Sequence, residues 1–190
     1  DASKDFDRIA KALMNEWVIQ VEDVKYRIAE IEFYLQDADH DDTYTHGHDL
    51  QRSRGRWYFH TSGVDLTFGN DAGRYGGILI RAIQEVGGDE HYEYGPLNVV
   101  RELMSNLPGA QLESDSEKNI RFGLVPDRSL NVEQVIKGPR VGLNETKHPE
   151  MYEKPYRHLI FPKKKHAEKT RIYNYWKKET TEKEAKKIWA

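Results

Sequence analysis

The sequence predicts an α+β fold, a single domain in which helices flank a mixed, mainly antiparallel sheet. Two hydrophobic periods support this class. Residues 5–17 place apolar side chains at helical spacing, whereas residues 26–35 alternate polar and apolar side chains as a strand does. Several shorter strand-like segments follow, separated by Gly, Asn and Asp turns. No repeat or linker divides the chain before a basic tail that begins at residue 163.

The expected elements can be placed in chain order. A helix over residues 5–17, capped by Ser3 or Asp5, leads into a short strand at 18–21. A turn at Glu22 and Asp23 then returns the chain as the strand 24–35. Gly95-Pro96 opens a helix at about 97–106. Further strands or turns are expected at 57–60, 64–68, 76–83, 119–125, 130–136 and 156–161, with a polar loop at 37–56. The domain is taken as 1–162 and the helical tail as 163–190.

Composition limits the classes of function. The chain contains no cysteine, which excludes a disulfide framework, a thiolate zinc site and a thiol nucleophile. No apolar run approaches the ~18 residues of a membrane span, and the N-terminal residues do not form a signal peptide. We therefore expect no membrane partner and a cytoplasmic location. No GxGxxG or GK[ST] motif occurs, so no nucleotide cofactor is expected.

Charge is distributed unevenly along the chain. Residues 154–190 carry a net charge of +8, whereas the preceding 153 residues carry −11. A basic end on an acidic body indicates either a contact with a polyanion or a solvated helix. The lysines at 163–165 fit a polyanion clamp, while Trp176 and Trp189 fit a helix that docks on the domain. The sequence leaves both interpretations open.

The strand at 26–35 carries the strongest functional signal. Ile31, Phe33 and Leu35 share one face, and the other face carries Glu30, Glu32 and Tyr34. One interpretation is an edge strand with its carboxylates in water. The other places Glu32 at the mouth of a pocket as a general base, with Tyr34 as an aromatic wall.

Several short motifs, in order, resemble the alkyladenine (3-methyladenine) DNA glycosylase family. Residues 26–35 resemble the family's RIVETEAYLG strand, and residues 77–82 resemble its VLLRA strand. Weaker matches are Arg52-Ser53-Arg54-Gly55 to an RN loop, Phe68-Gly69 to YG, Gly95-Pro96 to GPxxL, residues 139–142 to ARVG and residues 154–160 to KPLRFYV. The resemblance covers roughly residues 6–161. It is supported by the fact that the motifs occur in the same order as in the family, with similar spacing.

The resemblance implies a curved sheet and a function. It assigns Glu32 to the activation of water, Tyr34 to stacking on a flipped purine and Arg81 to the orientation of water and phosphate. It assigns Phe68 to the wedge that fills the gap in the duplex. The implied protein is a monofunctional glycosylase of bacterial type, a cytoplasmic monomer that acts on double-stranded DNA at nucleoid lesions. It would hydrolyse the N-glycosidic bond of an alkylated or deaminated purine without metal or cofactor.

Some family positions are altered. The histidine that contacts the flipped base falls on Thr43, and His46, or else His40 or His48, is a candidate to replace it. The second stacking tyrosine falls near Asp65, which cannot stack. These changes put the base preference in question. The loop arginines are expected to contact phosphates or to be plain loop charges: Arg52, Arg54 and Arg56.

Two other functions use the same residues. A non-catalytic module could keep the fold and a groove for nucleic acid or a small ligand. A metal-dependent hydrolase could use the loop 39–60, because imidazole and carboxylate groups suit Zn, Fe or Mn. The candidate ligands for that metal are Asp39, His40, Asp42, His46, His48 and His60.

Overall fold

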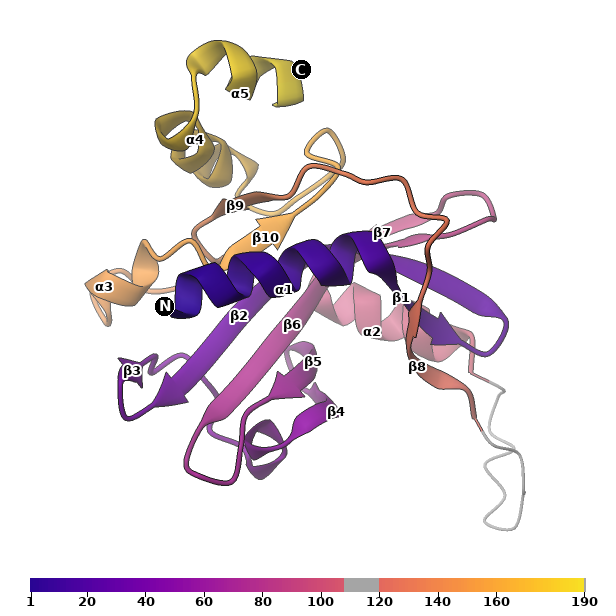
Figure 1. Cartoon of the computed structure of the whole chain (residues 1–190), viewed down its shortest axis with the longest axis horizontal. Helices are drawn as coiled ribbons and strands as arrows, with labels where there is room; N and C mark the ends of the chain where they lie inside the picture. The colour runs from indigo at the N-terminus through magenta and orange to yellow at the C-terminus, as the bar shows by residue number, and fades with distance from the viewer. Residues whose placement is uncertain (108–119, 190) are drawn as a thin grey trace.

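The computed structural model describes residues 1–107 and 120–189, and it confirms the α+β class (Figure 1). The helices are α1 (Ala2–Glu16), α2 (Pro96–Ser105), α3 (Pro149–Tyr152), α4 (Lys169–Glu179) and α5 (Glu182–Trp189), with a 3-10 turn η1 (Asp49–Arg52). The strands are β1 (Trp17–Val21), β2 (Val24–Asp37), β3 (His40–Asp41), β4 (Arg54–His60), β5 (Gly63–Phe68), β6 (Tyr75–Glu85), β7 (Tyr92–Tyr94), β8 (Phe122–Pro126), β9 (Ile136–Gly138) and β10 (Arg157–Leu159).

The described strands form one antiparallel sheet in the order β4-β5-β6-β2-β1-β8. The short strands β3 and β10 also pair with β2, β7 pairs with β6, and β9 extends the sheet from β10. The sheet is curled, as the contact between Trp57 of β4 and Phe122 of β8 shows: their ring centroids lie 5.1 Å apart. The two ends of the strand order therefore approach each other across the core.

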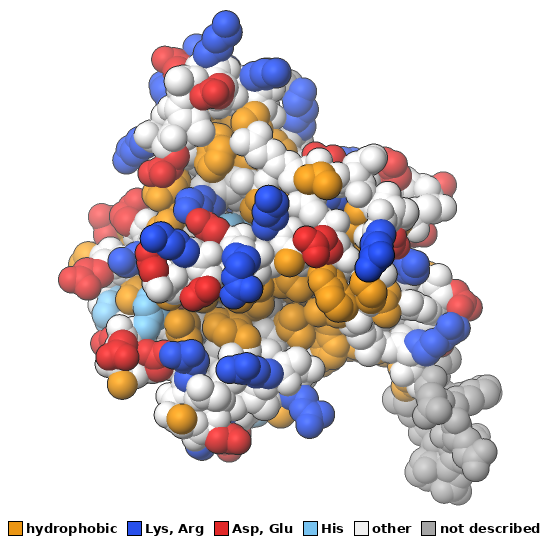
Figure 2. All heavy atoms as spheres, in the orientation of Figure 1, with side chains coloured by type: hydrophobic (Ala, Val, Ile, Leu, Met, Phe, Trp, Pro, Cys, Tyr) orange, Lys and Arg blue, Asp and Glu red, His pale blue; other side chains and the backbone are white. Residues whose placement is uncertain are grey.

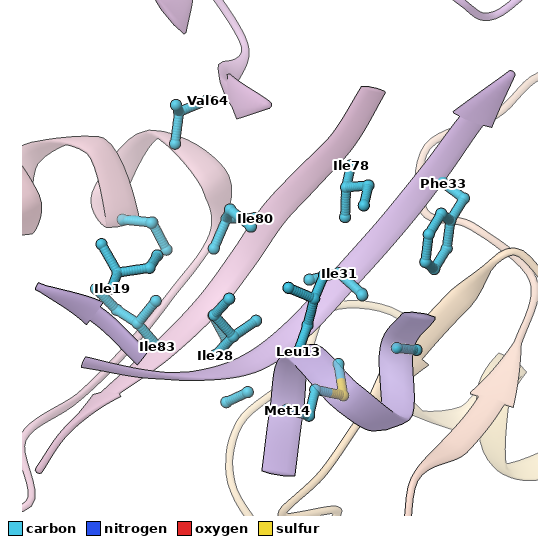
Figure 3. Packing of buried hydrophobic residues seen from close by; sticks show 14 of the residues in the cluster. Leu13, Met14, Ile19, Ile28, Ile31, Phe33, Val64, Ile78, Ile80 and Ile83 are labelled. Carbon is cyan, nitrogen blue, oxygen red and sulfur yellow. The ribbon is translucent and has the colours of Figure 1, made fainter. Parts of the chain in front are cut away.

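Helix α1 crosses the face of the sheet that carries the apolar half of β2 (Figure 1). The ring of Phe6 stacks on Phe33 with centroids 4.3 Å apart. Leu13 and Met14 point toward Ile28 and Ile31 in the same core (Figure 3). The helix begins earlier than predicted, since the side chain of Asp1, rather than Ser3 or Asp5, is the N-cap and accepts the Ser3 N–H.

Strand β2 lies in the interior of the sheet. It pairs with β6 along one side, and with β1 and then β10 along the other. Residues from Tyr26 to Phe33 are buried on both faces. The edge-strand interpretation was therefore wrong: Glu30 and Glu32 are 2% and 0% exposed.

Other elements differ from the sequence prediction. The loop 37–56 contains β3, η1 and the start of β4, while the segment expected at 130–136 is a strand only from Ile136. Strand β7 and helix α3 were not predicted. The strand expected from Asn119 is β8, and Asn119 itself lies outside the described residues.

The C-terminal tail docks on the sheet through an apolar cluster. Ile172 of α4 is fully buried against Ile136 of β9 and Leu159 of β10. Trp176 and Trp189, which the sequence marked as docking residues, pack around this cluster. The contact is close, because a Cβ at Gly138 would lie 2.7 Å from the Ile172 side chain.

Candidate functional site

Two hollows of different character lie on the two sides of the sheet. The larger, about 790 Å³, lies between α1 and strands β4 and β5 and contains neither Glu32 nor Arg81. Apolar side chains gather beside α1 on this face (Figure 2). The smaller, about 340 Å³, is lined by Tyr34, His46, Asp65 and Arg81, which the sequence had singled out. The second pocket is therefore the candidate site.

The candidate site is built by segments that are distant in the sequence. The central strands β2, β5 and β6 form its floor, the loop before η1 and the end of β4 form one wall, and residues 141–143 form another. Its lining also includes Tyr44, Gln51, His60, Ser62, Leu79, Pro96, Val141, Gly142 and Leu143. With about 340 Å³ and two tyrosines, Tyr34 and Tyr44, it suits a small planar ligand.

Glu32 lies directly beneath the site, in contact with three groups that line it. Its Oε2 accepts the Tyr34 hydroxyl at 2.8 Å and Arg81 Nη1 at 3.2 Å. Its Oε1 accepts the Val141 backbone N–H at 2.7 Å. A carboxylate oxygen can accept two hydrogen bonds, and Oε1 accepts one from the described residues. Burial and the adjacent Glu32 raise the pKa of Tyr34 well above its ordinary value, which keeps its hydroxyl a donor.

Arg81 is held in place by a buried network behind Glu32. Its Nε donates to Glu30 Oε1 at 2.9 Å, and the same oxygen accepts Arg157 Nε at 2.9 Å. His166 Nδ1 lies 2.6 Å from Glu30 Oε2. Burial alone would raise the pKa of Glu30, but Arg157, His166 and Arg81 outweigh it and lower the pKa to about 2. Glu32 and Glu30 likewise outweigh burial and raise the pKa of Arg81, so a fixed cation faces the pocket.

A second buried ion pair supports the tyrosine wall. Arg140 donates from Nη1 and Nη2 to the two carboxylate oxygens of Asp42, at 2.6 and 3.1 Å, and both side chains are fully buried. The Arg140 guanidinium lies 4.5 Å from the ring centroid of Tyr34 and 5.7 Å from that of Tyr44. The ion pair thus holds a cation against both aromatic rings.

Asp65 forms the polar wall opposite Glu32. Both residues pair with Leu79 of β6, so the two carboxylates lie on one face of the sheet on either side of Leu79. Asp65 Oδ2 accepts Gln51 Nε2 at 3.1 Å, and Oδ1 lies 3.1 Å from His60 Nε2. Asp65 thus gives this wall a carboxylate in place of an aromatic ring, while Tyr44, from another segment, also lines the pocket.

The structure does not bring all the expected residues into the site. Thr43 is exposed, and its neighbour Tyr44 lines the pocket instead. Phe68 lies on the opposite face of β5 from Asp65, because side chains alternate along a strand. Its ring packs against Phe6 and Phe33, with centroids 6.0 and 6.2 Å away. Phe68 is thus partly buried against the core on the face away from the candidate site, a position that does not fit its assignment as a wedge at that site.

The loop arginines do not form one phosphate-binding row. Arg52 is partly buried, donates to the Asp71 carbonyl at 2.9 Å and lies over the Tyr75 ring. Arg54 and Arg56 are exposed on the outer strand β4, and Arg54 lines the larger hollow beside α1. Only Arg54 and Arg56 are therefore open to a phosphate.

The residues proposed as metal ligands are dispersed into other roles. Asp42 pairs with Arg140, His48 stacks on Tyr58 with centroids 4.5 Å apart, and His60 contacts Asp65. Across residues 1–107 and 120–189, no three His, Cys, Asp or Glu side chains are grouped to hold a metal ion. The loop 39–60 thus presents no ligand set in the described chain.

Some site residues were missed but had a signal in the sequence. In the β4–β5 hairpin Tyr58 pairs with Asp65, so His60, two residues on, shares the face of Asp65. Recognising that pairing would have placed His60 in the pocket. Gln51 and Val141 come from loops, and no local pattern points to them.

Comparison with known proteins gives one relative and no family model. A scan against models of protein families finds no match. The chain is 32% identical over 187 residues to "Uncharacterized protein L759" of Acanthamoeba polyphaga mimivirus. The alignment covers 82% of this chain and 86% of the viral protein. No helix in the described parts of the chain has the length and apolar character needed to cross a membrane.

Proposed function

The chain belongs to the same family as the mimivirus protein L759, and we propose that it is a DNA glycosylase acting on a damaged purine. One observation carries this proposal. Glu32, the carboxylate expected to activate water, lies buried beneath a pocket of about 340 Å³ and is paired with Arg81, which lines that pocket together with two tyrosines. Hydrolysis of an N-glycosidic bond needs an oriented water, a base and a site for the flipped nucleobase.

The residues would share the reaction as follows. The flipped base would lie among Tyr34, Tyr44 and Leu143, with its sugar toward Arg81. Glu32 Oε1 would take a proton from water as the water oxygen bonds to C1′. The C1′–N bond would break, and its electron pair would leave with the base. Arg81 would hold the water and the phosphate in position beside C1′.

The product would be an intact abasic site. None of the described residues that line the pocket is a lysine, so no amine is placed there to form a Schiff base with the sugar. The substrate would be double-stranded DNA, held by phosphate contacts such as those of Arg54 and Arg56. We expect a monomer that works in the compartment that holds the DNA, the cytoplasm for a bacterial-type enzyme.

The experiment uses short duplexes that carry hypoxanthine, ethenoadenine or an alkylated purine. Each is incubated with the wild type, with Glu32→Gln and with Glu16→Gln, which changes an exposed glutamate at the end of α1, outside the pocket lining. Alkali then reveals abasic sites. We expect strand breaks on at least one of these duplexes with the wild type and Glu16→Gln, and none with Glu32→Gln. Equal cleavage by all the proteins would remove Glu32 from the reaction.

One observation favours a second function, a non-catalytic binding module. Glu32 is 0% exposed, and its carboxylate already accepts hydrogen bonds from Tyr34, Arg81 and Val141. In a binding module, a carboxylate bound in this way would position the pocket walls and take no part in a reaction. The two functions separate in the same experiment, because a binding module would retain a modified duplex at low salt without producing abasic sites.

A further inference from the structure

Asp65 differs from the other carboxylates around the candidate site. Glu30 and Glu32 each contact Arg81 within 3.2 Å, and Asp42 contacts Arg140 within 3.1 Å. Asp65 has no Lys or Arg within 4.0 Å among the described residues. Its hydrogen-bond partners are an amide, from Gln51, and an imidazole, from His60.

The imidazole of His60 turns its Nε2 toward Asp65. His60 Nδ1 accepts the Ser62 backbone N–H at 3.2 Å, so its ring proton lies on Nε2, which faces Asp65. The ring centroid of His46 is 4.6 Å from that of His60, and partial burial together with His60 lowers the pKa of His46, which disfavours a positive charge there. Among the described residues, Asp65 is therefore held by an amide and an imidazole, with no lysine or arginine beside it.

The position of Asp65 is fixed by its surroundings. Its side chain is 4% exposed, and Gly77 leaves the space that it occupies, since a Cβ there would lie 2.5 Å from Asp65 Oδ2. Glu32 and Asp65 are separated by one strand, which places their backbones roughly 10 Å apart at about 4.8 Å per strand. A base with its sugar at Glu32 would turn its far edge toward Asp65.

We infer that Asp65 binds an edge of the ligand that donates hydrogen bonds, and so selects nucleobases with an exocyclic amine over those with a carbonyl at that edge. This rests on the proposed function, which supplies the base as ligand. An ionised carboxylate only accepts hydrogen bonds, so an amine pairs with it and a carbonyl oxygen is repelled. Damaged purines that keep their amine would thus be substrates, and deaminated purines would not.

Binding of free bases tests this without any need for turnover. The affinities of the full-length protein for 2,6-diaminopurine and for hypoxanthine are measured by calorimetry or ligand-observed NMR. We expect the diamino base to bind at least about fivefold more tightly, the lower end of discrimination by a good hydrogen-bonded pair. Equal affinity, tighter binding of hypoxanthine, or binding of neither base by the wild type would overturn the inference.

Two variants assign the preference to Asp65. Asp65→Asn removes the charge at nearly constant shape, and Asp71→Asn makes the same change in charge on the exposed turn after β5. Asp65→Asn should reduce the preference to less than about twofold, and Asp71→Asn should retain it; an unchanged preference in Asp65→Asn would overturn the inference. If Asp65→Asn does not fold, the wild-type affinities alone decide. Selective base binding without excision would refute the glycosylase proposal but support the role of Asp65. Excision without selective binding would support the glycosylase proposal and refute the role of Asp65.

Discussion

Acid should weaken this fold through Glu30 in particular. The carboxylate is 2% exposed and contacts Arg81, Arg157 and His166, which hold its pKa at about 2 instead of 4.5. The folded pKa lies below the unfolded one, so the stabilisation is complete above about pH 4.5 and is lost as the pH falls toward 2. At ~1.4 kcal/mol per pKa unit, it amounts to about 3 kcal/mol, of which about 2 kcal/mol is lost by pH 3.

Comparison with Glu30→Gln isolates this contribution. At pH 7 the variant leaves Arg81 and Arg157 without their shared carboxylate. We therefore expect its free energy of unfolding to be about 3–5 kcal/mol lower than that of the wild type. Between pH 7 and pH 3 the difference between wild type and variant should shrink by about 2 kcal/mol, since other carboxylates titrate in both proteins. The measurement is urea unfolding followed by circular dichroism at both pH values. A difference that does not change with pH would refute the role assigned to Glu30.

Three substitutions extend the predictions to other parts of the fold. Asp42→Asn removes one half of a fully buried pair and should lower the free energy of unfolding by about 3–5 kcal/mol, whereas a loss under about 1 kcal/mol would mean that Arg140 finds another partner. Gly77→Ala places a Cβ 2.5 Å from a carboxylate oxygen of the pocket and should cost about 1–3 kcal/mol, while Gly123→Ala, with open space around it, should cost less; equal costs in urea unfolding would contradict this. Ile172→Ala should cost about 2–5 kcal/mol if the tail folds with the domain, and should speed amide exchange in α4; unchanged exchange would show that the tail docks independently of this contact.

The local pattern of the sequence predicted much of the fold. Alternation identified β2 and its two faces, and the helical period identified α1, because both signals depend on the neighbours in the chain. The same alternation could not show whether the face of β2 that carries Glu30 and Glu32 was exposed to solvent or buried. That depends on Arg81, Arg140 and Arg157, which lie 49 to 127 residues from the strand positions that they contact.

The candidate site was predicted only in part, because local patterns place residues on strands but not residues on loops. Tyr34 was placed by the alternation of its strand and Arg81 by the family resemblance, and both line the pocket. Tyr44 comes from the loop 37–56, where no period fixes the direction of a side chain. Phe68 was assigned by its place in a motif, but the alternation of β5 turns it into the core with Phe6.

The most direct measurement of the central claim is a single-turnover excision rate. A duplex carrying one alkylated purine is mixed with excess protein, and alkali-labile sites are followed over time for the wild type and for Glu32→Gln. If Glu32 activates the water, the wild type should excise the base and the variant should be slower by at least about 100-fold while still binding the duplex. Equal rates in the two proteins, or a wild type that binds the duplex and never produces an abasic site, would contradict it.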